Sequence, residues 1–214
     1  MEITWYGHSC FRIMERGMAS VVTDPYDHNS VGYSPLKLRA DIVSISHDTP
    51  EHNFVSAVKG KPFLLNGPGE FETGGVFITA VQTDGRGKKK SNEPRNTLYV
   101  FDYESVTVAH LGDLRSVPNQ TDIEALGQVN VALVPVGGSG GFTAAKAAEI
   151  VSMLEPGIVI PMNFSTPDTT LNLAPLSKFL KEMGAGKPEP GPVLKISRST
   201  IPSETQVMVL DYKH

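Results

Sequence analysis

Short hydrophobic runs recur along the first half of the chain, separated by turn-forming residues. β-Branched and aromatic residues are frequent in these runs, a composition typical of strands. The pattern predicts strands at 3–6, 10–14, 20–23, 41–46, 62–65, 76–81, 97–102 and 106–110. The first three strands, which end at Asp24-Pro25, are expected to form a meander.

The second half alternates strands with helices. Residues 131–135 and 158–162 are continuous apolar runs of the kind found in buried strands, and a helix capped by Thr143 is expected between them over 143–154. Further apolar side chains fall at helical spacing, at Leu173, Leu176, Phe179, Leu180 and Met183, and predict an amphipathic helix. Strands at 193–196 and 206–210 are expected to follow.

Strand-rich stretches that alternate with helices predict an α/β protein with packed sheets and helices outside. The sequence has 214 residues, a common length for one domain of such folds, so we expect a single domain over 1–214. No sequence repeat suggests another organisation.

Composition narrows the class of protein. Hydrophobic residues make up 40% of the chain, but no apolar stretch approaches the roughly 20 residues of a membrane-spanning helix. The opening residues lack the pattern of a secretory signal, and the single cysteine, Cys10, cannot form an internal disulfide, so a cytoplasmic protein without membrane contact is expected. The net charge of −4 argues against nucleic-acid binding through the whole surface.

Histidines and carboxylates gather at predicted strand ends, where rigid scaffolds usually carry chemistry. The histidines are His8, His28, His47, His52 and His110, and the carboxylates are Asp24, Asp48, Glu51 and Asp113. The densest group runs from His47 to His52, where a short helix is expected to begin at Pro50 or Glu51. Imidazole and carboxylate ligands suit zinc, iron or manganese.

The segment from His47 to His52 resembles the signature His-x-His-x-Asp-His of the metallo-β-lactamase superfamily, with Thr49 and Glu51 at two of its positions. Other matching segments occur in the same order, at 7–11, 24–25, 68–72, 110–113, 134–138 and 159–163. Together they are similar to the small prokaryotic branch that includes ascorbate-phosphate lactonase-like proteins. The resemblance implies a four-layer αββα sandwich of two mixed sheets with helices outside.

In such relatives two metals are held by histidines and aspartates. The resemblance carries the first site onto His47, with Thr49 at the second position and Asp84 as the nearest substitute for a loop histidine. It carries the second site onto Glu51, His52 and Asp113, with Asn163 in place of a late histidine. Hydroxyl and amide groups bind transition metals poorly, so the site looks degenerate and holds at most one ion, of zinc, manganese or iron. The ligands expected are His47, Glu51, His52 and Asp113.

Two functions remain open. One is a metal-dependent hydrolase of a small ester, lactone or phosphoester, anionic substrates included, in which Glu51 and Asp113 bind the metal or position water and Asp48 is an alternative acid or base. The other is a catalytically silent homologue, in which the same polar groups form a hydrogen-bonded remnant and the pocket binds a small anionic metabolite or a protein partner.

Two loops are further candidates for anion contact. The backbone N–H groups of 137–141 could face an anion, although a permissive turn into the following helix is the simpler interpretation. The basic run from Arg86 to Lys90 could contact phosphate, although a solvated loop is the simpler interpretation.

Overall fold

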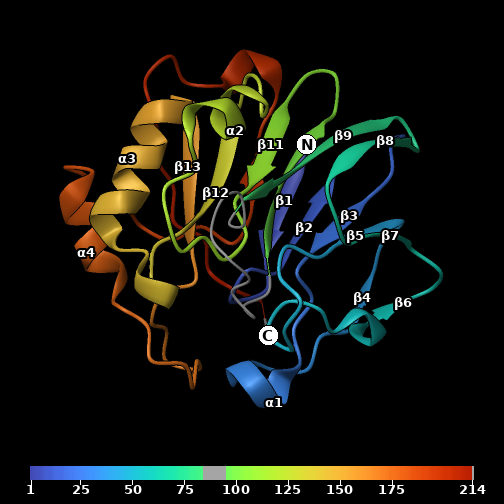
Figure 1. Cartoon of the computed structure of the whole chain (residues 1–214), viewed down its shortest axis with the longest axis horizontal. Coiled ribbons are helices and arrows are strands. Elements are labelled where there is room, and N and C mark those ends of the chain that lie inside the picture. The colour runs from blue at the N-terminus through green and yellow to red at the C-terminus, as the bar shows by residue number, and fades with distance from the viewer. Residues whose placement is uncertain (84–94, 214) are drawn as a thin grey trace.

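The computed structural model describes residues 1–83 and 95–213, and its strands form two large sheets that pack face to face (Figure 1). The six-stranded sheet has the order β14 (Leu194–Lys195), β1 (Glu2–Trp5), β2 (Phe11–Met14), β3 (Val21–Thr23), β5 (Ile42–Ser44) and β7 (Phe63–Leu65). The seven-stranded sheet has the order β15 (Gln206–Val207), β13 (Ile158–Met162), β12 (Val131–Pro135), β11 (Thr107–His110), β10 (Asn96–Asp102), β9 (Val76–Thr83) and β8 (Gly69–Thr73). A small third sheet pairs β4 (Leu38–Arg39) with β6 (Val58–Lys59).

Each large sheet is mixed and contains a run of parallel strands. Strands β3, β5 and β7 are parallel in the first sheet, and β11, β12, β13 and β15 are parallel in the second. Parallel neighbours end on the same side of their sheet. The segments that follow β3, β5, β11, β12 and β13 therefore meet at one edge of each sheet.

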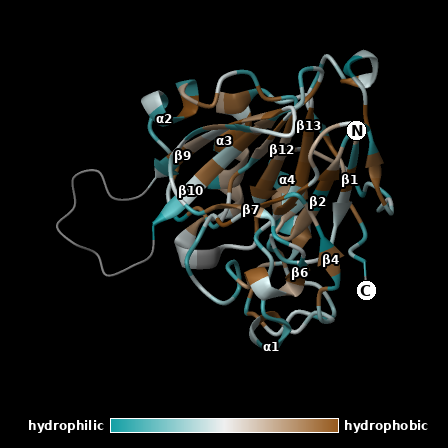
Figure 2. Cartoon of the chain, turned by 90° about the vertical axis from the view of Figure 1, so that its right-hand side faces the viewer, coloured by the Kyte–Doolittle hydropathy of each residue, from teal (hydrophilic) through white to brown (hydrophobic). Residues whose placement is uncertain are grey.

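One hydrophobic core lies between the sheets. Ile3, Trp5 and Phe11 of the first sheet belong to the same buried cluster as Val108 and Leu133 of the second. The central strands β12 and β13 are buried at every position, which explains their continuous apolar sequences (Figure 2).

Helices cover the second sheet more fully than the first. Helices α3 (Ala144–Leu154) and α4 (Leu176–Glu182) lie together beside β12 and β13 (Figure 1). The predicted cap of α3 is confirmed, because Thr143 Oγ1 accepts a hydrogen bond from Lys146 N at 3.4 Å. The outer face of the first sheet is covered by a second apolar cluster, which draws on the short helix α1 (His28–Val31) and on β4 and β6.

The expected sandwich of two mixed sheets is confirmed, and the expected strands are present with boundaries shifted by a few residues. The strands β4, β6 and β8 and the helices α1 and α2 (Gln120–Glu124) were not predicted. Within the described ranges, no helix is long and apolar enough to span a membrane.

The helix expected from Pro50 or Glu51 is wrong. Residues 49–52 form a single turn, in which the backbone N–H groups of His52 and Asn53 both donate to Thr49 O at 2.9 Å. Long-range bonds divert the chain here, because Asp27 N donates to Pro50 O at 2.9 Å and Phe54 N donates to Pro25 O at 2.7 Å. The turn is followed by a short 3-10 helix, η1 (Val55–Ala57).

Candidate active site

A cavity of about 470 Å³ lies where the segments after the parallel strands meet. It brings together the predicted metal ligands His47, Glu51, His52 and Asp113 from loops after β5 and β11. The complete lining is His8, His47, Thr49, Glu51, His52, Asp113, Arg115, Gly138, Gly140, Leu171, Asn172 and Leu173. His47, His52 and Asp113 thus line one cavity although they follow two different strands.

Asp24 fixes the orientation of the His52 ring. Its side chain is fully buried after β3 and lies 2.9 Å, Oδ2 to Nδ1, from His52. Ser46 holds the same carboxylate through its backbone N–H, at 2.7 Å, and through its hydroxyl. A carboxylate at Nδ1 accepts the proton there and leaves the Nε2 lone pair for a ligand, the arrangement usual for metal-binding histidines.

The same contacts set the protonation of this pair. Burial alone would lower the pKa of His52, but the hydrogen bond and negative charge of Asp24 outweigh it, and the pKa is raised. Burial alone would raise the pKa of Asp24, but the nearby rings of His110 and His52 outweigh it, and the pKa is lowered. Asp24 is therefore a carboxylate at neutral pH.

His8 faces His52 across the pocket wall. Their Nε2 atoms are 3.3 Å apart, and the ring centroids are 4.8 Å apart. Burial and the neighbouring His52 ring hold the pKa of His8 well below its usual value, so His8 is neutral. Two facing nitrogens at this distance need either a shared proton or a cation between them. Two imidazole nitrogens bonded at 2.0–2.1 Å to one tetrahedral ion would be about 3.3–3.4 Å apart.

His47 adds further donor atoms to the cavity. Its residue is only 2% exposed, and neither ring nitrogen has a hydrogen-bond partner among the described residues. Burial and the nearby His52 ring lower its pKa, so this ring is also neutral. Buried polar atoms without a protein partner are usually met by water or an ion.

The chemistry of these donor atoms suits a transition metal. Neutral imidazoles with available nitrogens and a carboxylate are the ligands that zinc, iron and manganese prefer. Across residues 1–83 and 95–213, however, no three histidine, cysteine, aspartate or glutamate side chains are already arranged around one point. Binding would require His47 or Asp113 to move toward the pair of His8 and His52.

Three site residues have strained backbones. His8, Asp24 and Asn163 have φ angles of 48°, 39° and 53°, in the left-handed region that non-glycine residues rarely adopt. Such conformations cost of order 1–3 kcal/mol each and cluster at functional sites. The backbone of His8 is held in place by the Trp5 indole, whose Nε1–H donates to His8 O at 3.0 Å.

A family model described as a β-lactamase superfamily domain matches residues 2–163. The chain belongs to the metallo-β-lactamase superfamily. A crystal structure of a candidate Zn-dependent hydrolase of this superfamily from Thermotoga maritima has 33% sequence identity and a TM-score of 0.81, covering 99% of each chain.

Relatives in sequence belong to the UPF0173 group. The UPF0173 protein of Pyrococcus furiosus is 29% identical over 78% of this chain and 84% of its own length. A UPF0173 metal-dependent hydrolase of Thermoplasma acidophilum is 24% identical over 78% of this chain and 85% of its own length. Human tRNase Z, short form, shares the fold, with 10% identity and a TM-score of 0.54 over 78% of this chain and 93% of that chain.

Several candidate residues from the sequence lie away from the cavity lining. Asp48 is exposed, and its Oδ1 accepts a hydrogen bond from Asn53 Nδ2 at 2.6 Å. Asn163 is 1% exposed, and its Oδ1 accepts a hydrogen bond from Ser9 Oγ at 2.7 Å. His28 is on the surface beside Asp27, while Asp84 and the run from Arg86 to Lys90 lie outside the described residues.

The ligand set expected from the sequence did not include His8 or Asp24, and Arg115 was not among the candidates. His8 was visible as a histidine next to a glycine after a strand, and Asp24 as a carboxylate at a strand end. Nothing in the sequence showed which of these strand ends would meet.

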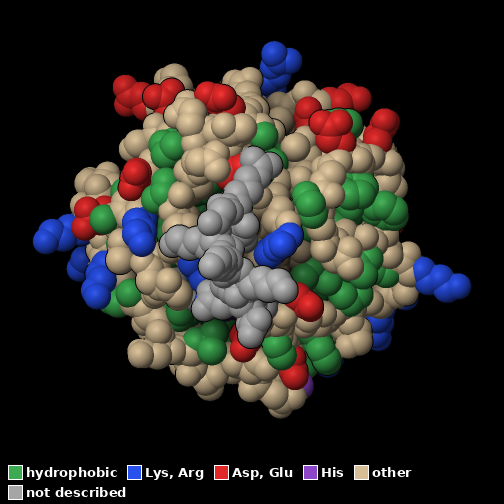
Figure 3. All heavy atoms as spheres, in the orientation of Figure 1, with side chains coloured by type: hydrophobic (Ala, Val, Ile, Leu, Met, Phe, Trp, Pro, Cys, Tyr) green, Lys and Arg blue, Asp and Glu red, His purple; other side chains and the backbone are tan. Residues whose placement is uncertain are grey.

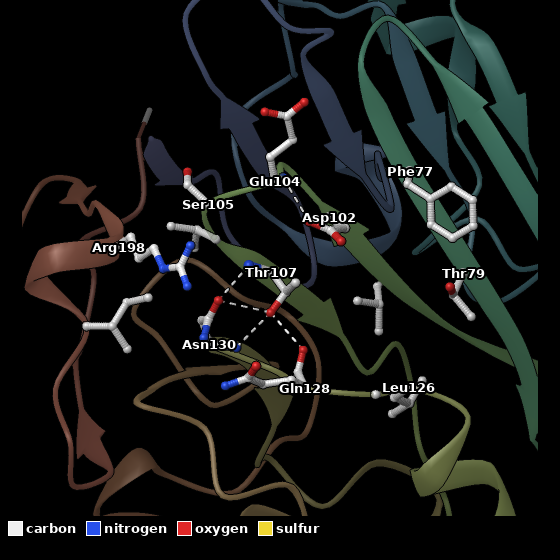
Figure 4. Close-up of a pocket in the computed structure, with 14 residues that line it drawn as sticks. Phe77, Thr79, Asp102, Glu104, Ser105, Thr107, Leu126, Gln128, Asn130 and Arg198 are labelled. Carbon is white, nitrogen blue, oxygen red and sulfur yellow. Dashed lines mark hydrogen bonds between the residues drawn. The ribbon is translucent and has the colours of Figure 1, made fainter.

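A larger cavity of about 570 Å³ lies elsewhere, between β9, β10, β11 and η3 (Arg198–Thr200) (Figure 4). Its polar groups bond one another: Thr107 N donates to Asn130 Oδ1 at 2.9 Å, and Thr107 Oγ1 donates to Gln128 O at 2.8 Å. No histidine or cysteine is among its described lining residues, so it lacks the donors of the first cavity. On the face shown in Figure 3, the lysine and arginine side chains of the described residues are scattered and form no continuous basic surface.

Proposed function

We propose that this protein is a metal-dependent hydrolase with one metal, held by His8, His52 and a third ligand from His47 or Asp113, which leaves one position for water. The opposed Nε2 atoms of His8 and His52, 3.3 Å apart, carry the proposal. The unpartnered nitrogens of His47 in the same cavity support it. So do relatives named as metal-dependent hydrolases.

A bound zinc, manganese or iron ion would lower the pKa of a water molecule and polarise a carbonyl or phosphoryl oxygen. The chain supplies orientation and proton transfer. Asp24 keeps the Nδ1 proton of His52 in place. Glu51 is a half-buried carboxylate in the cavity wall and would accept a proton from the attacking water. Asp48 takes no part, because its side chain is exposed beside Asn53.

The substrate is a small ester, lactone or phosphoester. A cavity of about 470 Å³ falls within the range of sites for small molecules, roughly 300–1,000 Å³. The site is reduced to one metal because Thr49 offers a hydroxyl where the superfamily signature has its second histidine. We also propose that residues 1–214 form one domain that works in the cytoplasm, where a lone buried thiol such as Cys10 stays reduced.

Metal analysis combined with a hydrolysis screen tests the proposal. Wild type, His52→Gln and His28→Gln would be titrated with zinc and manganese by calorimetry and assayed against esters, lactones and phosphodiesters. His28 is the matched control because its ring is on the surface. We expect one metal per chain and turnover in wild type and His28→Gln, and loss of both in His52→Gln. A protein that binds no metal and is fully folded would refute the proposal.

A catalytically silent homologue is the second candidate. The observation that favours it is that the described residues contain no ready-made group of three metal-binding side chains. In that case the histidines form a hydrogen-bonded remnant, and the pocket binds a small anionic metabolite or a protein partner. Folded, metal-free protein whose melting temperature does not respond to zinc would select this function.

A further inference from the structure

Arg115 introduces a positive charge into the cavity. Of the described residues that line it, Arg115 is the one lysine or arginine. Its side chain is 33% exposed, and its Nη2 lies 4.0 Å from Asp113 Oδ2. The cation therefore lies beside the proposed metal ligands and is still open to solvent.

A glycine loop provides the seat for this side chain. Gly140 has a φ of +54°, and a Cβ there would lie 2.6 Å from Arg115 Cγ and 2.8 Å from Cδ. Any side chain at this position would push the arginine stem away. Gly138, with a φ of +83°, lines the same cavity. The loop after β12 thus leaves room for Arg115 in the cavity, because Gly140 has no side chain where the aliphatic part of the arginine passes.

We propose that Arg115, seated on Gly140, binds an anionic group of the substrate, a carboxylate or a phosphate, while the bond to be hydrolysed lies at His8, His47 and His52. This inference rests on the proposed hydrolase function and names its substrate class. A guanidinium offers paired N–H donors whose geometry matches both anions. The ion pair with Asp113, at 4.0 Å, places the guanidinium next to a proposed metal ligand.

The rest of the cavity fits a small organic anion. Leu171 and Leu173 form an apolar part of the wall, with Asn172 between them. A substrate with a short carbon skeleton can cover the leucines and place its charged end on Arg115. A neutral substrate of the same size would gain only the apolar contact.

Two matched esters test the assignment. Mono-p-nitrophenyl adipate and p-nitrophenyl hexanoate differ by a terminal carboxylate in place of a methyl group. We expect the ratio of kcat/KM for the anionic ester to that for the neutral ester to fall about 10- to 100-fold in Arg115→Gln, mainly through KM. Arg115→Lys should keep part of the wild-type preference for the anionic ester, because lysine retains the positive charge but lacks the paired N–H donors of the guanidinium. Arg198→Gln, an exposed arginine at the other cavity, should leave the ratio unchanged.

A binding measurement separates this inference from the hydrolase proposal. Inorganic phosphate and adipate would be titrated by calorimetry into wild type, Arg115→Gln and Arg198→Gln, each as purified. Loss of binding in Arg115→Gln alone supports the inference even if no ester is hydrolysed, and the anion whose binding is lost identifies the class. No binding in wild type, or equal binding in all three proteins, would overturn it.

Two further variants distinguish a specific loss of anion binding from a general loss of folding. Arg115→Lys and Gly140→Ala would be compared with wild type by urea denaturation. Folded Gly140→Ala should show the same loss of anion binding, because its Cβ displaces the arginine stem. If kcat/KM falls equally for both esters in folded Arg115→Gln, the residue has a structural role and the inference is wrong.

Discussion

The Nε2 atoms of His8 and His52 face each other across 3.3 Å, although the two residues are 44 positions apart in the sequence. Asp24 holds Nδ1 of His52, so Nε2 is the nitrogen left for this contact. We therefore predict that His8→Gln weakens zinc binding as strongly as His52→Gln. Loss of an outer hydrogen-bond partner already costs about 10- to 100-fold in metal affinity, and loss of a ligand should cost at least that.

Zinc calorimetry on the two variants and on His28→Gln measures this effect. His28 has an exposed side chain, so its variant should bind zinc like wild type. Wild-type affinity in His8→Gln would show that the contact with His52 is a simple hydrogen bond between two rings.

Gly112 is predicted to tolerate a side chain poorly. It has a φ of +62°, and a Cβ there would collide with Asn96 Oδ1 and lie 2.6 Å from Ser46 Cβ. Asn96 Oδ1 accepts the Asp113 N–H at 2.8 Å, so the collision would also disturb a proposed ligand. Gly112→Ala should cost about 3–5 kcal/mol in the free energy of unfolding.

The matched control is Gly127→Ala. Gly127 has a similar φ of +65°, but a Cβ there would meet nothing within 4 Å. It should lose only the backbone cost, about 1 kcal/mol. Urea denaturation of both variants gives the difference, and equal losses would mean that the crowding at Gly112 is relieved by small shifts.

The contribution of Asp41 to the free energy of unfolding is predicted to depend on pH. Hydrogen bonds from the backbone and hydroxyl of Ser20, both 2.8 Å, lower the pKa of its carboxyl, as does the charge of Arg12. Because the folded pKa is below the unfolded value, the stabilisation is complete above the unfolded value of about 3.9 and is lost as pH falls through the folded pKa. Asp41 is exposed, so screening keeps the effect below about 1 kcal/mol.

Asp41→Asn should therefore be less stable than wild type at pH 7, and the difference should shrink below about pH 4. Urea denaturation at a series of pH values measures it. Asp48→Asn, another exposed aspartate, is the comparison for a general charge effect. A difference that stays constant from neutral to strongly acidic pH would contradict the prediction.

Restoration of the superfamily signature should increase metal affinity. Thr49 and Glu51 line the cavity, so Thr49→His with Glu51→Asp places an imidazole and a shorter carboxylate beside His47 and His52. We expect zinc to bind at least about tenfold more tightly, because a zinc site gains from each added nitrogen ligand. Zinc calorimetry tests this, and unchanged affinity would mean that these positions do not point at one centre.

A third change, Asn163→His, would restore the late histidine. It should raise affinity further but cost about 1–3 kcal/mol in stability, because Ser9 Oγ loses its acceptor at a buried site. Urea denaturation of the double and triple variants separates the two effects. A triple variant as stable as the double variant would show that the histidine replaces this hydrogen bond.

Local patterns in the sequence determined most of the elements. Strands β12 and β13 follow from continuous apolar runs, and the start of α3 follows from Thr143, because burial and capping act over a few residues. The resemblance of 47–52 and of further segments in the same order to a known family gave the superfamily, and with it the sandwich of two mixed sheets.

Tertiary structure decided which of these residues act together. A turn forms at 49–52 in place of the expected helix, because the backbone N–H of Asp27 bonds to Pro50 within the turn and that of Phe54, just after it, bonds to Pro25. The contacts of His52 with Asp24 and His8, and the seat of Arg115 on Gly140, join segments that follow different strands. Their meeting depends on the order and direction of strands in two sheets, and this long-range packing cannot be read from the spacing of residues along the chain.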